Sequence, residues 1–237
     1  MTVYPADSVD FRNVTEGNVR QKRAVLERFA EQALRSHAKS DPRADHRLRL
    51  IQLNIINSLT RNSAILGFTT DWLVCASISP FPCTQQGPKP GTLRAPCPDN
   101  LIPTKLQLEV QHHPWVDLFP LPRMRDNFLL AITSILPPEK EAQLWEDVVE
   151  LGGEKDWSGF VVWGESWDPR NWEATVPFLR RWGWLLRGCP EIVEATNYWR
   201  CCRGESPIEA EVLVSDEVSC LSSLVGVDYV SSFSFNV

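Results

Sequence analysis

Apolar positions recur along much of the chain at helical rather than strand spacing. Between residues 42 and 66, one face is formed by Leu48, Ile51, Ile55, Leu59, Asn62 and Leu66. Asp41 and Pro42 are typical of a helix start, because aspartate caps free N–H groups and proline fits the first turn. Gly67 is typical of a helix end. The pattern therefore predicts a helix over residues 42–66.

Similar spacing, with proline, glycine or hydroxyl residues at the ends, predicts further helices. They are expected over residues 18–38, 71–77, 104–111, 122–134, 137–151, 176–187 and 190–203. Residues 160–163, with the sequence FVVW, are short, apolar and bounded by glycines, which favours a strand. The expected fold class is mainly α with a minor β component, in a single compact helical domain.

Proline and charge divide the chain into three parts. Residues 1–40 are expected to form an N-terminal arm and a basic helix, residues 41–205 the main helical domain, and residues 206–237 an acidic C-terminal tail. The tail leaves open either a further strand or partial disorder. Within the main domain, residues 80–103 hold seven of the 18 prolines, which predicts a linker or a long surface loop.

The net charge of −6 is unevenly spread. Residues 1–100 carry 13 Lys and Arg against 9 Asp and Glu, whereas residues 101–237 carry 11 against 21. A general nucleic-acid binder is usually basic, so the whole chain does not fit that class. A local basic face is nevertheless present, and it is either solvated or in contact with phosphates. Its candidate residues are Arg20, Lys22, Arg23, Arg43 and Arg47.

Membrane, secretion and metal signals are weak. No stretch approaches the roughly 18–20 apolar residues of a membrane span, and the N-terminus lacks a basic segment followed by an apolar run. Seven cysteines without a disulfide pattern indicate a reduced, cytoplasmic compartment. Cys83 and Cys97 lack zinc-ligand spacing. Nucleotide-binding glycine motifs are missing too. No metal site is expected.

The segment HHPWVDLFPLPRMRDN, residues 112–127, embeds polar residues among apolar ones. Its adjacent histidines point in different directions on any regular element, so they do not form a paired metal motif. Each is a candidate general base, a partner for a substrate or a structural group. The candidate catalytic residues are His112, His113 and Asp117. Candidate substrate contacts are Arg123, Arg125 and Asp126, and these arginines either pair internally or hold a phosphate or carboxylate.

A second segment, residues 163–200, contains six of the ten tryptophans. Carboxylates among indole rings suit a guanidinium group, because the acid offers a charged hydrogen-bond partner and the ring face a cation–π contact. Alternatively, Asp168 caps a turn before a proline and Glu165 is solvated. Cys189 is either a thiol activated by a helix start or a buried apolar residue. The candidate substrate contacts are Trp163, Glu165, Trp167, Asp168 and Asn197.

Three motifs carry a family resemblance: SPF at residues 79–81, the 112–127 segment, and WGESWDP with the tryptophan-rich sequence that follows it. Over about residues 48–205 the chain resembles a fungal domain of unknown function that is often found C-terminal to bZIP-type regions. The region around Arg20–Arg23 lacks the bZIP basic pattern and leucine heptads, so DNA is not expected as a partner.

A copy without a zipper resembles the fungal arginine-containing cyclodipeptide synthases. That resemblance implies that arginyl-tRNA and a second aminoacyl-tRNA are consumed to give a cyclo(Arg-Xaa) diketopiperazine, with no cofactor because the ester is already activated. The basic residues named above would then contact tRNA. Two alternatives are a regulatory or protein-interaction module that lacks its DNA-binding part, and another small biosynthetic enzyme.

Overall fold

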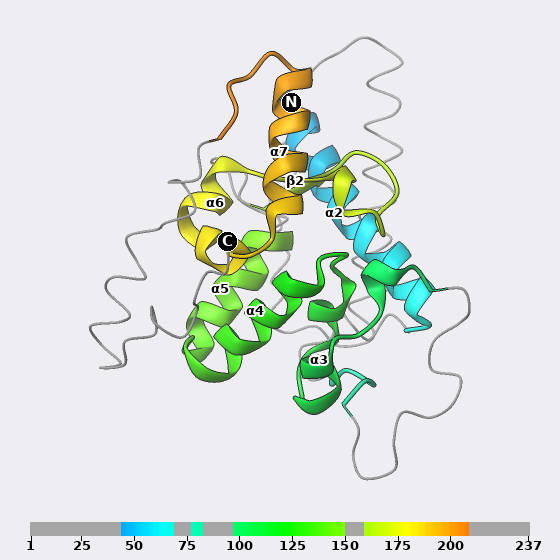
Figure 1. Ribbon diagram of the computed structural model, residues 1–237. Helices are drawn as coiled ribbons and strands as arrows, with labels where there is room; N and C mark the ends of the chain where they lie inside the picture. The colour runs from blue at the N-terminus through cyan, green and yellow to red at the C-terminus, as the bar shows by residue number, and fades with distance from the viewer. Residues whose placement is uncertain (1–43, 69–76, 83–96, 150–158, 209–237) are drawn as a thin grey trace, which may run out of the picture.

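Six α-helices and a small two-stranded sheet make up the described part of the computed structural model, which comprises residues 44–68, 77–82, 97–149 and 159–208 (Figure 1). The α-helices are α2 (Ala44–Leu66), α3 (Lys105–Glu109), α4 (Pro122–Ser134), α5 (Pro138–Val149), α6 (Val176–Trp182) and α7 (Pro190–Cys202). Short 3-10 turns are η3 (Asp99–Leu101), η4 (Pro114–Leu118), η5 (Pro169–Asn171) and η6 (Gly183–Leu186). The expectation of a helical domain with a minor β component is confirmed.

Most helix ends agree with the local sequence signals. α2 ends at Leu66 and is followed by Gly67 at a φ of 75°, a conformation that glycine adopts without steric penalty. α4 occupies the predicted range, and α5 and α7 begin at prolines. The predicted helices over 18–38 and 71–77 lie outside the described residues.

Two predicted helices are shorter than expected. The helix expected over 104–111 is α3, which ends at Glu109. It begins with a capping box, in which the side chains of Thr104 and Gln107 each bond the other residue's backbone. The helix expected over 176–187 changes into the 3-10 turn η6 at Gly183, a residue type with low helix propensity.

The sheet pairs β1 (Phe160–Val162) with β2 (Trp172–Ala174) in antiparallel register, Val161 opposite Glu173. β1 confirms the predicted strand, whereas β2 is too short for its alternation to be visible in the sequence. The connecting loop, residues 163–171, carries the WGESWDP motif. At Gly164 an added Cβ would lie 2.8 Å from the Asn171 side chain, so the loop needs a glycine there for close packing.

Aromatic rings from distant segments form the centre of the core. Phe119 lies with its ring centroid 5.6 Å from Phe128 and from Trp172, and 5.8 Å from Phe160. Phe160 in turn lies 4.6 Å from Phe178 of α6. All five side chains are essentially inaccessible to solvent. Burial of such large rings is the main stabilising contribution that joins η4, α4, the sheet and α6.

The proline-rich segment is not simply a surface loop. Phe81 and Leu101, near its two ends, are only 2% and 1% exposed and belong to the core. The prediction for residues 80–103 is therefore wrong at these ends, because apolar residues between the prolines anchor the segment. Residues 83–96 lie outside the described structure.

Candidate functional site

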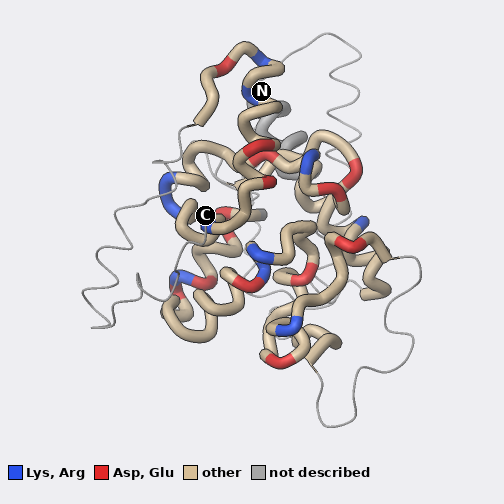
Figure 2. The backbone as a smooth tube through the Cα atoms, viewed as in Figure 1, with Lys and Arg blue, Asp and Glu red and all other residues tan. Residues whose placement is uncertain are grey.

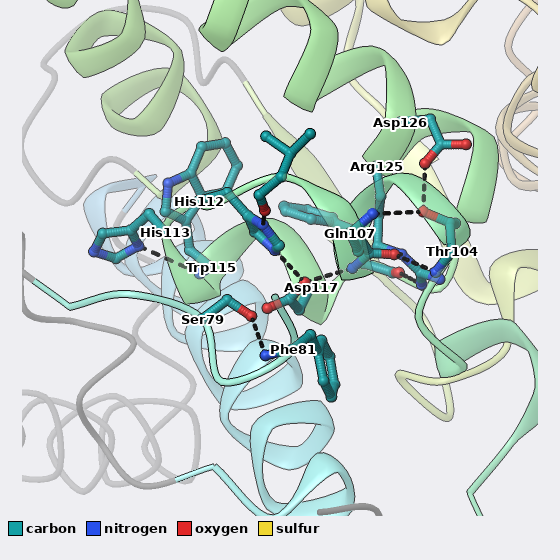
Figure 3. A network of polar contacts seen from close by, with 12 residues as sticks. Ser79, Phe81, Thr104, Gln107, His112, His113, Trp115, Asp117, Arg125 and Asp126 are labelled. Atoms are coloured by element: carbon teal, nitrogen blue, oxygen red, sulfur yellow. Dashed lines mark hydrogen bonds and ion pairs between the residues drawn. The ribbon is translucent and has the colours of Figure 1, made fainter. Parts of the chain in front are cut away.

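The 112–127 segment forms a buried polar network (Figure 3). His112 Nε2 lies 2.7 Å from Asp117 Oδ1, and His112 Nδ1 lies 2.6 Å from the carbonyl oxygen of Val110. Carbonyl oxygens and ionised carboxylates only accept hydrogen bonds, so both ring nitrogens donate when His112 is protonated and Asp117 is ionised. In that state the two side chains form a buried ion pair, and they are only 1% and 0% exposed.

Two opposing effects act on the proton of His112. Burial lowers the pKa of the ring, but the hydrogen bond to Asp117 and its negative charge raise it, and the net result is a raised pKa. While both nitrogens donate, His112 has no lone pair with which to accept a proton. A catalytic role for His112 and Asp117 stays a prediction, and it would require the ring to release one of these bonds.

Gln107 of α3 connects this ion pair to Arg125. Its Nε2 donates to Asp117 Oδ1, and its Oε1 accepts from Arg125 Nε at 2.9 Å and from the Thr104 backbone N–H at 2.9 Å. The orientation of the Gln107 side-chain amide is therefore fixed by the contacts of both its nitrogen and its oxygen. The second carboxylate oxygen, Asp117 Oδ2, is buried without a hydrogen-bond partner among the described residues.

Arg125 serves as an internal cap for backbone carbonyls. Its two terminal nitrogens donate to the carbonyl oxygens of Asn100, Phe119 and Ile102, at 2.6 to 2.7 Å. The side chain is fully buried, which lowers its pKa to about 10. Within the described residues, the partners of this guanidinium group are carbonyl oxygens and the Gln107 amide rather than the Asp117 or Asp126 carboxylates. The guanidinium group thus fixes the η3 turn against η4.

The other candidates of this segment are less buried. The His113 ring accepts a hydrogen bond at Nδ1 from the Trp115 backbone N–H at 3.3 Å, which caps η4. Asp126 accepts from the Thr104 hydroxyl at 2.5 Å. Arg123 is exposed, and its side chain passes close to Gly188. Of the two histidines, His113 is therefore the one nearer to solvent.

Asn62 of α2 joins the 112–127 segment to the WGESWDP loop. Its Nδ2 donates to the carbonyl oxygens of Leu118 and Ser166, at 2.8 and 2.9 Å, and its Oδ1 accepts from the Ser166 hydroxyl at 2.7 Å. Asn62 and Ser166 are both buried. Asn62 thus links the two segments through a closed hydrogen-bonded junction.

The loop carboxylates Asp168 and Glu165 have different environments. Both oxygens of Asp168 are bound by the Arg170 guanidinium, at 2.6 to 3.1 Å, and Oδ1 also caps η5. The hydrogen bonds from Arg170 hold the pKa of Asp168 below its ordinary value. Glu165 is exposed, and no contact of its carboxylate is found within the described residues. Trp163 and Trp167 are 45% and 36% exposed.

Among the described residues, a guanidinium lies against an indole ring beside Glu173 of β2. Arg203 donates from its two terminal nitrogens to the two Glu173 oxygens, at 2.6 and 2.8 Å. The Trp163 indole N–H donates to Glu173 Oε2 at 2.8 Å, and the guanidinium carbon of Arg203 lies 5.4 Å from the Trp163 ring centroid. A carboxylate, an indole face and a guanidinium are thus combined within the protein, with Glu173 as the acid. The contacts of Glu165 and Asp168 to a substrate guanidinium stay predictions.

Helix α7 brings two of these groups together. Trp199 and Arg203 are four residues apart and therefore neighbours on one helix face. Trp199 stacks on Trp163 with ring centroids 5.2 Å apart and an interplanar angle of 21°. In Figure 1 α7 lies beside β2, the strand that carries Glu173. Arg203 also donates to Glu205 at 2.8 Å, and the hydrogen bonds to Glu173 and Glu205 raise the pKa of Arg203.

Several further candidates have structural contacts or lie outside the description. Asn197 exchanges hydrogen bonds with the backbone of Ile208, at 2.6 and 3.2 Å, and so holds the chain after α7. Arg20, Lys22, Arg23 and Arg43 lie outside the described residues, and of Arg47 only its place in α2 is described. In the described ranges, acidic and basic positions are interspersed along the backbone (Figure 2).

Cys189 has an apolar environment. Cys189 is buried, which raises its pKa to about 12, so the apolar alternative holds and the activated thiol does not. Within the described residues no three His, Cys, Asp or Glu side chains gather as metal ligands do. None of the described helices is long and apolar enough to cross a membrane.

Four residues that build this region were not among the site candidates predicted from the sequence: Asn62, Glu173, Trp199 and Arg203. The four-residue spacing of Trp199 and Arg203 was a visible signal for a shared helix face. Glu173 gave no such signal, because its partners are 10 and 30 residues away along the chain.

These features define a mainly helical domain in which a two-stranded sheet and α7 hold a guanidinium against indole rings. Residues 80–193 match the family model described as a domain of unknown function (DUF3425). The match includes the 112–127 segment and the WGESWDP loop, and it agrees with the resemblance to a domain of unknown function. No curated protein and no solved structure matches the chain.

Proposed function

We propose that this protein is a tRNA-dependent cyclodipeptide synthase that joins arginine from arginyl-tRNA to a second amino acid from another aminoacyl-tRNA. The product would be a cyclo(Arg-Xaa) diketopiperazine. Each α-amine would attack the carbonyl carbon of the other ester, lose a proton and displace the ribose hydroxyl of that tRNA, so that two amide bonds form as two ester bonds break. Because the esters are already activated, the reaction needs a site for the arginine side chain, contacts to tRNA and a base, but no cofactor. A cytoplasmic location would suit this use of charged tRNA.

The observation that supports arginine as a substrate is the surface formed by Trp163, Trp199 and Glu173. This surface holds the guanidinium of Arg203 by a two-oxygen carboxylate contact and an indole face. These are the interactions that distinguish a planar guanidinium from an ammonium group. Glu165, which is exposed on the same loop as Trp163, is a second proposed contact, and Asp168 is a third that would first have to release Arg170.

A base is needed to deprotonate the attacking α-ammonium group. His113 is the better candidate of the two histidines, because its side chain is less buried than that of His112. Basic residues before and within α2 are the proposed tRNA contacts, since neutralised phosphates are the usual source of affinity for nucleic acid.

The deciding experiment is incubation of the purified protein with tRNA charged with labelled arginine and other amino acids. We expect a cyclo(Arg-Xaa) product by mass spectrometry, and RNase treatment of the charged tRNA should abolish it. Expression in a heterologous host would identify the second amino acid. Absence of any arginine diketopiperazine in both experiments would exclude this function.

One observation favours a second candidate, a regulatory or protein-interaction module. Trp163, Trp167 and Tyr198 are large aromatic side chains that are 36% to 60% exposed, and such residues are enriched at protein interfaces. If charged tRNA gives no product, a pull-down with the wild type and a Tyr198→Ser variant would test this alternative.

A further inference from the structure

We propose that the carboxylate of Glu173 and the ring of Trp163 form a guanidinium-binding site which Arg203 of the same chain closes, and that the arginine side chain of an aminoacyl substrate takes the place of Arg203. The inference rests on the proposed function for the nature of its substrate. Its test uses no tRNA, so the two can fail separately.

The side chains of Glu173 and Arg203 differ in their exposure to solvent. The Glu173 side chain is 7% exposed, whereas that of Arg203 is 34% exposed. The carboxylate therefore lies at the base of the contact and the cation approaches it from the solvent side. Removing the cation alone would leave a nearly buried carboxylate without a charge partner, which is unfavourable unless another guanidinium replaces it.

Glu173 is held in position by contacts other than its ion pair with Arg203. Its strand β2 is paired in register with β1, and Trp163 donates an indole hydrogen bond to Oε2. Trp163 is in turn stacked on Trp199, and the Trp199 indole N–H donates to the carbonyl oxygen of Arg170 at 2.9 Å. The acceptor and the ring face are thus preorganised by the sheet, the loop and α7.

Arg203 lies at the C-terminal end of α7, where its side chain can separate from Glu173. It is the residue after the last turn of α7, and Gly204 follows with a φ of 74°. Its remaining side-chain contact is with Glu205, an exposed residue that also pairs with Arg200 at 3.0 Å. On leaving Glu173, the Arg203 guanidinium would therefore retain a carboxylate partner in Glu205, which lowers the free energy of opening.

The test is binding of argininamide, which has the guanidinium and free α-amine of the substrate but no carboxylate. Calorimetry and tryptophan fluorescence should detect binding to the wild type, and an Arg203→Met variant should bind at least about tenfold tighter, because an intramolecular competitor is removed. Glu173→Gln should abolish binding in either background. Glu194→Gln, on the same helix and exposed, is the matched control. Lysinamide and citrullinamide should bind weakly, since one lacks the planar fork and the other the charge.

Hydrogen exchange in the wild type distinguishes a ligand site that Arg203 occupies from an ion pair with only a structural role. The amides of Gly204 and Glu205 are hydrogen-bonded to the last turn of α7, and argininamide should increase their exchange as Arg203 leaves. Binding to Arg203→Met alone, with no binding to the wild type, would mean a vacated structural pair and would overturn the proposal. Tighter binding of an arginine blocked at both ends would overturn the aminoacyl assignment and indicate a peptide ligand.

Discussion

At the residue scale, Asp117 is the charge on which the interior network depends. It is the only carboxylate that contacts His112 among the described residues, and Gln107 donates to the same oxygen. Breaking a buried ion pair by removing one partner is strongly destabilising. We expect Asp117→Asn to lower the free energy of unfolding by roughly 3 kcal/mol in urea titrations. Asp168→Asn, which breaks a pair with an exposed arginine, should have a much smaller effect, and equal losses would contradict this view of the network.

His112 predicts a pH dependence of stability with a definite sign. Its folded pKa is raised, chiefly because Asp117 outweighs burial, so the folded state binds the proton more tightly than the unfolded state does. The stabilisation is complete below the unfolded pKa of about 6.5 and is lost as the pH rises through the folded pKa. Urea midpoints of the wild type should therefore fall over that interval. A His112→Gln variant should lack this fall, and an unchanged fall in the variant would assign it to another group.

Arginine use should depend differently on the two acids near Trp163. Glu173 is nearly buried, so Glu173→Gln should reduce cyclo(Arg-Xaa) formation by about a hundredfold or more. Glu165 is exposed and screened by water, so Glu165→Gln should reduce it by only about two- to fivefold. Melting curves would control for unfolding. A larger loss for Glu165→Gln than for Glu173→Gln would place the arginine site at the loop tip.

At the element scale, the loop between β1 and β2 is fixed by a close contact rather than by unusual backbone angles. Gly164 faces the Asn171 side chain, whose Nδ2 donates to the carbonyl oxygen of Glu165 at 3.2 Å. We expect Gly164→Ala to lower the free energy of unfolding by about 1 kcal/mol, because this side chain must move. In an Asn171→Ala background the same change should cost little, which a double-mutant cycle would measure. Additive effects would show that the contact is not the cause.

The elements themselves were largely predictable where the signal is local. Pro122, Pro138 and Pro190 lie in the first turn of their helices, and Gly67 follows the end of α2 at a positive φ. The short elements were not predictable. η4, β2 and η5 span three to five residues each, and such lengths show no periodicity.

At the scale of the whole molecule, charge separates the proposed tRNA contacts from the arginine site. The first hundred residues are basic on balance and the remainder is acidic. Changing Arg20, Lys22 and Arg23 together to Glu should raise the apparent KM for charged tRNA, and wild-type binding should weaken steeply with salt. The control is argininamide binding, which the triple change should leave intact. If the triple change left product formation at low tRNA concentration unaltered, these residues would form a solvated face without a role in tRNA binding.

The sequence by itself determined the helical class, most helix ends and the two segments in which polar residues gather among aromatic ones. These follow from contacts within a few residues, such as caps, prolines and a spacing of three to four. Tertiary structure alone decided that His112 pairs with Asp117 in the interior, that Arg125 caps carbonyls, and that Glu173 is the acid facing a guanidinium. The reason is physical. A polar side chain's role depends on which partners reach it and how far water is excluded, and here the deciding partners, such as Asn62 with Ser166, are up to 104 residues apart.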